Sequence, residues 1–235
     1  MPRHGWYIIS VYVITLILLT SSIVASLTST NKYRLAESGL PTVSVDDFIK
    51  KSKSLDLIGL RYRPNWFGQK LIHMFTGSTW THVACLWNGH VIEVNTTDHS
   101  VGRINSGLQI TRLESWISKY IKDYDIIWVT FNHKDDKESC YTSLCKSFDQ
   151  LVKNTASCRL VCNPFAYGGS IWKDRPFAAK WNLPRSRMLC TELLIYYYQQ
   201  LGIIDKTRPT DSYDPAEMIF ERLSKKWDVS RHLVV

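Results

Sequence analysis

THVACLWNGHVIEVN, residues 81–95, carries the clearest structural signal in the chain. Two runs rich in β-branched and aromatic residues flank Asn88 and Gly89, and this dipeptide is typical of a two-residue β-hairpin turn. The stretch therefore predicts an antiparallel hairpin in which Trp87 lies opposite His90 and the strands extend back to His82 and forward to residue 95.

The register of this hairpin places four residues on one face, because side chains alternate along a strand. They are His82, Ala84, Glu93 and Asn95. His82 lies diagonal to Glu93, and backbones in a diagonal pair are roughly 7–8 Å apart, within reach of long side chains. Glu93 or Asn95 could accept the proton of one imidazole nitrogen and leave the other nitrogen as a base. A structural ion pair gives the same pattern, so the hairpin alone does not establish catalysis.

Cys190 opens a predicted helix over residues 190–201. Leu194, Tyr197 and Leu201 share its face at helical spacing, so the thiol is expected on the core side of a helix N-terminus. Unpaired N–H groups and the helix dipole favour an anion there, and a nearby histidine cation lowers a thiol pKa further. The alternative is an inert buried cysteine, the common state of a single cysteine on an apolar helix face.

The remaining patterns predict further helices and strands around these two features. Helices are expected at Ser44–Lys51, Asn65–Thr76, Leu113–Ile121, Asp135–Asn154 and from Asp214 to about Trp227, and strands at Leu55–Tyr62 and Asp125–Phe131. Asp214, Pro215 and Glu217 form a helix start, with an N-cap, proline in the first turn and a capping-box glutamate. The mixture predicts an α+β domain with a small antiparallel sheet packed on helices.

The N-terminal segment Trp6–Leu27 contains no charged residue. Its length matches the ~20 apolar residues that cross a bilayer. We expect residues 1–27 to form a single-pass transmembrane anchor, residues 28–43 a linker, and residues 44–235 one domain. A cleaved signal peptide is the alternative, because small residues follow the apolar core. Basic residues flank both ends of the segment, so the positive-inside rule leaves the membrane orientation open.

Composition adds limits on the partners. The net charge is +8 and the isoelectric point about 9.2. The basic residues are scattered and are not interleaved with aromatics, so no nucleic-acid partner is expected. The spacings of Cys140, Cys145, Cys158 and Cys162 are wider than those of a zinc knuckle, so neither a metal nor another cofactor is expected. Cys140, Cys145, Cys158 and Cys162 could form disulfides or serve as small buried hydrophobes.

Four stretches resemble the circularly permuted NlpC-type branch of the papain-like fold, which includes YiiX-like hydrolases, viral proteins of unknown activity and lecithin–retinol acyltransferases. SLDLIGLRY is similar to the opening strand of that family, TGSTWTHVACLWNGHVIEV to its histidine hairpin, NPFAYGGSIW to its aromatic segment, and LCTELLIYYYQQLGI to its cysteine motif. The resemblance implies that Cys190 is the nucleophile, His82 the general base and Glu93 the third member, with Asn95 as the alternative.

The chain departs from the family at several positions. Leu55 precedes Asp56 where the family has glycine, and Thr81 and Thr191 replace serines beside the histidine and the cysteine. Residues 187–189 lack the usual aromatics, which leaves the oxyanion donor open, with the backbone N–H of Cys190 as the candidate.

The resemblance implies a membrane-anchored thiol hydrolase or acyltransferase that forms an acyl-enzyme from an amide, ester or thioester. A lipid, peptide or protein is the expected substrate, and no cofactor is needed. The alternative of another class is an anchored, non-catalytic binding or structural protein that keeps the fold. A third possibility is a secreted, disulfide-linked protein.

Overall fold

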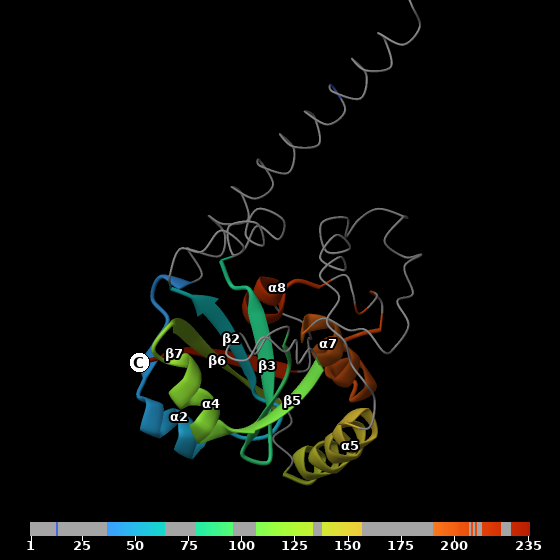
Figure 1. Cartoon of the computed structure of the whole chain (residues 1–235). Coiled ribbons are helices and arrows are strands. Elements are labelled where there is room, and N and C mark those ends of the chain that lie inside the picture. Colours follow the sequence, from blue (N-terminus) through green and yellow to red (C-terminus); the bar gives the residue numbers. More distant parts are fainter. Residues whose placement is uncertain are drawn as a thin grey trace, which may run out of the picture.

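A seven-stranded sheet forms the centre of the molecule, with the strand order β1-β7-β6-β2-β3-β4-β5. The computed structural model describes residues 37–63, 79–95, 107–133, 138–156, 190–206, 208, 210, 213–221 and 227–235, together with Val13. The strands are β1 (Thr42–Val43), β2 (Leu57–Tyr62), β3 (His82–Trp87), β4 (His90–Asn95), β5 (Gly107–Arg112), β6 (Tyr124–His133) and β7 (Trp227–Val234). Helices pack around the sheet, which makes the described part a mixed α+β fold (Figure 1).

The sheet is larger than the sequence predicted. Neighbouring strands run antiparallel except β1 and β7, which run parallel at one edge. β5 follows the predicted hairpin and pairs along β4, and β7 pairs along β6. Neither strand has a strong local signal, because both are defined by long-range pairing with a neighbour. The prediction of a small antiparallel sheet is therefore corrected in size and in the direction of one pair.

The helices start close to the expected positions. They are α2 (Val45–Lys51), α4 (Leu113–Tyr120), α5 (Glu138–Ala156), α7 (Cys190–Gln200) and α8 (Pro215–Phe220). At α2 the Ser44 hydroxyl accepts from the N–H of Asp47, and at α8 Asp214 and Glu217 form the predicted capping box. The predicted helix Asn65–Thr76 lies outside the described residues.

The last helix is shorter than predicted. We expected it to reach about Trp227, but α8 ends at Phe220 and Trp227 begins β7. Glu221 already has extended backbone angles, with φ −87° and ψ 156°. A capping box specifies where a helix begins and carries no information on where it ends. From Trp227 onward, the pairing of β7 with β6 determines the conformation of the chain.

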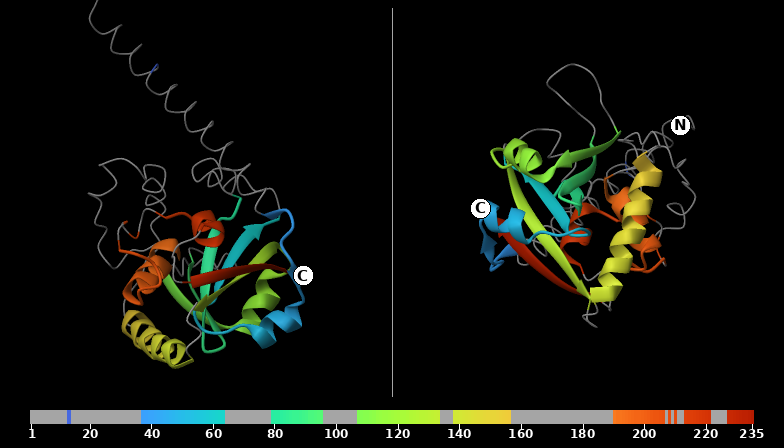
Figure 2. Two further views of the ribbon diagram at one scale, coloured as in Figure 1. Left: turned by 180° about the vertical axis from the view of Figure 1, so that it is seen from behind. Right: turned by 90° about the horizontal axis from the view of Figure 1, so that it is seen from below.

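Two apolar cores lie on opposite faces of the sheet, and Figure 2 shows the helices on either side of it. On one face α5, α7 and α8 pack against residues that include Val83 and Cys85 of β3. On the other face α2 and α4 pack against residues that include Ala84 and Leu86 of the same strand. The alternation along β3 thus assigns its odd-numbered residues to the α7 face and its even-numbered residues to the α4 face.

Gly59 of β2 permits the close packing of α8 on the sheet. A Cβ atom at this position would lie 2.3 Å from Cδ1 of Ile219 and 2.7 Å from Cγ2 of Ile127. We expect Gly59→Ala to lower the free energy of unfolding by about 1–3 kcal/mol, because overpacking forces neighbouring side chains from their rotamers. Chemical denaturation of the full chain in detergent measures this change.

A second substitution tests the cause of that loss. Ile219→Val removes the Cδ1 atom that the new methyl group would meet at 2.3 Å. Gly59→Ala combined with Ile219→Val should therefore be less destabilised than the sum of the two single variants. Wild-type stability of Gly59→Ala alone, or strict additivity in the double variant, would contradict the packing argument.

The end of the predicted linker belongs to the packed domain. Residues 42–43 form β1, and the Glu37 carboxylate accepts hydrogen bonds from Trp80 and Arg61. Within the described ranges, no helix has the length and apolarity to cross a membrane. The segment Trp6–Leu27 lies outside those ranges apart from Val13.

Candidate active site

The hairpin of β3 and β4 has the predicted turn and the predicted register. Asn88 and Gly89 have positive φ angles of 47° and 73°, as the favoured two-residue turn requires. The paired residues are Trp87 with His90, Leu86 with Val91, and Cys85 with Ile92.

Beyond Cys85 the hairpin departs from the predicted ladder. Its pairing ends at Cys85 and Ile92, so the expected pairs of Ala84 with Glu93 and of His82 with Asn95 are not part of it. β4 continues alongside β5 instead, with Glu93 opposite Gln109. The N–H of Val83 faces the β4 side, where a continued ladder would have used it. This local opening frees that donor for another partner.

His82 and Glu93 still meet, at the end of the hairpin distant from its turn. His82 Nε2 lies 2.8 Å from Glu93 Oε2. The side chain of His82 is 17 % exposed and that of Glu93 is 1 % exposed. The alternation that the sequence revealed is therefore sufficient to bring the imidazole and the carboxylate together without a continuous ladder.

Cys190 is the first residue of α7 and is buried. The His82 side chain and the backbone N–H groups of Val83 and Thr191 lie close enough to its sulfur to lower the pKa of Cys190. Because His82 Nε2 contacts Glu93, Nδ1 is the ring nitrogen left for the thiol. Three elements therefore meet at one point: the N-terminus of α7, the first residue of β3 and the middle of β4.

Cys190 and His82 each stabilise the charged form of the other. Burial alone would raise the pKa of Cys190, but the charge and hydrogen bond of His82, with the N–H groups of Val83 and Thr191, hold the pKa below its usual value. Burial alone would lower the pKa of His82, but Cys190 and Glu93 raise it. Both shifts favour a thiolate beside an imidazolium cation at neutral pH.

Glu93 is held in its ionised form within the α4 face of the sheet. Burial alone would raise the pKa of Glu93, but His82, Trp116 and Tyr120 together keep it below its usual value. The Tyr120 hydroxyl donates to Glu93 Oε1 across 3.1 Å. The sequence predicted α4 as a helix but assigned neither aromatic residue to the site. Their spacing of four residues, which places both on one helix face with Glu93 on the adjoining strand, was the available signal.

The other candidate positions lie partly outside the described residues. The backbone of Asn95 pairs with Gly107, but its side chain is not described, so its role as the alternative third member stays a prediction. Residues 163–172, NPFAYGGSIW, and residues 187–189 are not described either. Among the described side chains, no group of three or more His, Cys, Asp or Glu could hold a metal ion.

Leu55 stands where the family that the sequence resembles has glycine. Its φ angle is +75°, in the left-handed region that glycine adopts without strain and a bulky residue rarely enters. Leu55 remains buried, and its N–H donates to the carbonyl of Leu86. The next residue, Asp56, accepts from the N–H of Lys53 and from Trp128 Nε1. Contacts with Leu86 and Trp128, both distant in the sequence, thus hold the turn into β2.

No protein-family model matches the chain, and no curated protein matches it in sequence. Among solved structures, it is similar to the crystal structure of metalloprotein YiiX from Escherichia coli O157:H7, with a TM-score of 0.40 and 15 % identity over 77 % of this chain and 88 % of that one. At this level of similarity, a function has to be argued from the arrangement of Cys190, His82 and Glu93 itself.

Proposed function

We propose that the chain is a membrane-anchored thiol hydrolase or acyltransferase with a circularly permuted papain-like fold. Cys190 is the nucleophile, His82 the general base and Glu93 the third member. The observation that supports this proposal is the contact of the Cys190 thiol with His82, whose Nε2 lies 2.8 Å from the buried carboxylate of Glu93. A nucleophile, a base and an orienting group in this order are the parts that covalent acyl transfer requires.

In the first half of the reaction, the Cys190 thiolate attacks the carbonyl carbon of an amide, ester or thioester. A carbon–sulfur bond forms, and the carbonyl oxygen takes the negative charge. The N–H groups in the first turn of α7 have no partner within the helix, so the N–H of Cys190 is the proposed donor to this oxygen. The leaving group then departs with the proton that the His82 imidazolium donates, and an acyl-enzyme remains.

In the second half, neutral His82 removes a proton from water, an amine or an alcohol, which attacks the acyl-enzyme. The carbon–sulfur bond breaks, the acyl group leaves with the acceptor, and the thiolate–imidazolium pair is restored. Glu93 accepts a hydrogen bond from His82 Nε2–H and stabilises the imidazolium in both halves of the reaction. Water as acceptor gives hydrolysis, and an amine or alcohol gives transfer.

The proposed substrates are lipids and membrane-associated peptides or proteins. The predicted anchor over residues 6–27 would hold the site near a bilayer, and a net charge of +8 favours an anionic surface. A location near a bilayer restricts the substrates that the protein meets. No cofactor and no nucleic acid takes part in the proposed reaction.

Trapping of the acyl-enzyme tests the proposal. The full chain in detergent is mixed with a long-chain acyl thioester, a phospholipid and a peptide ester, quenched in acid and digested for mass spectrometry. We expect the acyl mass on the peptide that contains Cys190 with at least one of these donors. Cys140, a free and partly exposed thiol, serves as the internal control. No adduct at Cys190, or equal labelling of Cys140, would favour the non-catalytic alternative.

A further inference from the structure

We propose that Tyr120 is a positioning residue of this site, which holds one oxygen of Glu93 so that the other stays directed at His82. This inference rests on the proposed function, because it concerns the reactivity of the same cysteine. It extends the site from three residues to four and adds α4 to the elements that build it.

The geometry forms a continuous chain of contacts through the sheet. Tyr120 Oη lies 3.1 Å from Glu93 Oε1, and Glu93 Oε2 lies 2.8 Å from His82 Nε2. The side chain of His82 in turn lies close enough to Cys190 for each group to shift the pKa of the other. Tyr120 belongs to the core on the α4 face, and Cys190 belongs to the core on the α7 face. The four residues therefore connect the two sides of the molecule.

Burial makes the Tyr120 hydroxyl important to Glu93. Only 1 % of the Glu93 side chain is exposed, so solvent can hardly replace a missing donor. A buried carboxylate requires donors for both oxygens, and an unpaired oxygen is costly in a medium of low dielectric constant. His82 is the donor to Oε2, and the Tyr120 hydroxyl is the donor to Oε1. Without the second donor, the pKa of Glu93 would rise, and the carboxylate would lose the negative charge that supports the imidazolium at a higher pH.

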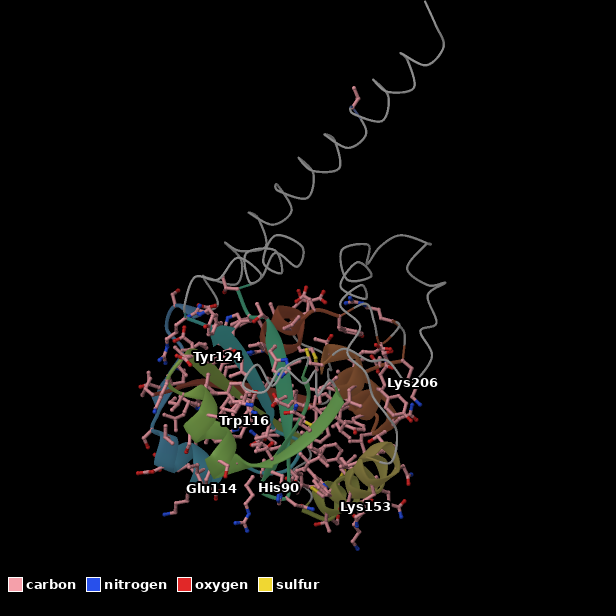
Figure 3. The ribbon with its side chains drawn as sticks, in the orientation of Figure 1. His90, Glu114, Trp116, Tyr124, Lys153 and Lys206 are labelled. Atoms are coloured by element: carbon pink, nitrogen blue, oxygen red, sulfur yellow. The ribbon has the colours of Figure 1, made fainter. Side chains whose placement is uncertain are left out.

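The surroundings of Tyr120 fix its position. Its ring lies 4.6 Å from that of Trp116 and 5.2 Å from that of Tyr124, measured between centroids. Figure 3 labels Trp116 and Tyr124 on the side of the sheet where α4 packs. Trp116 Nε1 is buried and completes no hydrogen bond with a described residue, although its N–H group lies near enough to favour the ionised carboxylate. Tyr120 is therefore the neutral donor whose geometry with Glu93 is complete.

The charged and titratable groups around Glu93 come from three elements. β3 contributes His82, and α4 contributes Tyr120 itself. Lys119, also of α4, lies over the Tyr120 ring at 5.1 Å. β6 contributes Tyr124, whose pKa is raised by burial and in part by the charge of Glu93. Gln109 of β5, opposite Glu93, carries no charge.

Tyr120→Phe tests the inference through the pH dependence of Cys190 alkylation. Loss of the hydroxyl weakens the support of Glu93 for the His82 cation, and the weaker cation stabilises the thiolate less. The acid limb of the profile should move to higher pH. We expect an alkylation rate about three- to tenfold lower on that limb and a nearly unchanged rate on the plateau, since only part of the effect of a hydrogen bond on Glu93 is transmitted to Cys190.

Tyr124→Phe is the matched control. It removes a hydroxyl from the same aromatic cluster, near the same carboxylate, without removing a hydrogen bond to Glu93. Its profile should match that of the unmodified chain. In a Glu93→Gln background, Tyr120→Phe should cause no further shift, because the group through which it acts has lost its charge. A merely structural tyrosine would shift the profile equally in both backgrounds.

A variant that retains the hydroxyl guards against misfolding of Tyr120→Phe. 3-Fluorotyrosine at position 120 has a more acidic hydroxyl, donates a stronger hydrogen bond and should move the acid limb to lower pH. Equal profiles for the phenylalanine variants at 120 and 124, or no response to 3-fluorotyrosine, would overturn the inference. Absence of thiolate reactivity at neutral pH in the unmodified chain would instead overturn the proposed function.

Discussion

Cys190→Ala is expected to eliminate acylation of the chain and to reduce any acyl transfer by a factor of roughly 10³ or more, because no covalent intermediate can form. The substituted residue is the first of α7 and belongs to the apolar core on that face of the sheet. The measurement is the rate of acyl release from the donor identified by mass spectrometry. Cys190→Ser should lose nearly as much, since a hydroxyl is not ionised by His82 at neutral pH.

Cys85→Ala provides the control for loss of a buried thiol. Cys85 lies in the same apolar core as Cys190, but burial is the sole cause of its pKa shift and raises the pKa far above the usual value. This variant loses a buried sulfur of the same size and should keep its activity. Activity retained in Cys190→Ala, or lost to the same extent in a folded Cys85→Ala, would contradict the assignment of the nucleophile.

His82→Gln should give the second large effect, on the alkylation of Cys190 near pH 6. Glutamine retains an N–H donor for the buried Glu93 carboxylate but removes the cation that stabilises the thiolate. The pKa of Cys190 then rises, because its burial is no longer opposed by that charge. We expect a fall in rate of about 10- to 100-fold, since a thiol with an ordinary pKa near 8.5 has under a hundredth of its population ionised at pH 6. Mass spectrometry of the alkylated peptide measures the rate.

His90→Gln is the corresponding control. His90 lies at the turn of the same hairpin, where its Nδ1 contacts the backbone oxygen of Asn88. Figure 3 shows its label at the lower end of the molecule, beside that turn. The substitution should leave the alkylation rate unchanged. Rapid labelling of Cys190 in His82→Gln at pH 6 would show that the imidazole does not generate the thiolate.

The sequence was most informative where short-range chemistry determines the structure. Asn88 and Gly89 adopt the positive φ angles that their turn requires, and this turn sets the register that brings His82 beside Glu93. Asp214 and Glu217 likewise form the expected helix start. In each case, residues within a few positions of one another make the decisive contacts, so a local pattern is sufficient.

The parts that the sequence did not reveal depend on distant contacts. β7 forms because it pairs with β6, about a hundred residues earlier, and the capping box of α8 does not specify that partner. Where the β3–β4 ladder ends, the N–H of Val83 lies near the Cys190 sulfur of α7, more than a hundred residues away in the chain. Tyr120 joins the site only after α4 has packed on the sheet. In each of these three contacts the two partners are too far apart in the sequence for a local pattern to reveal them.

The ultraviolet absorbance of the thiolate, titrated in the unmodified full chain and in Cys190→Ser, tests the ion pair most directly. The arrangement of Cys190 and His82 predicts a thiolate signal already present at neutral pH, below the ordinary thiol pKa of about 8.5. That signal should be absent from Cys190→Ser. A signal that emerges only above the ordinary pKa, or one that Cys190→Ser leaves intact, would contradict it.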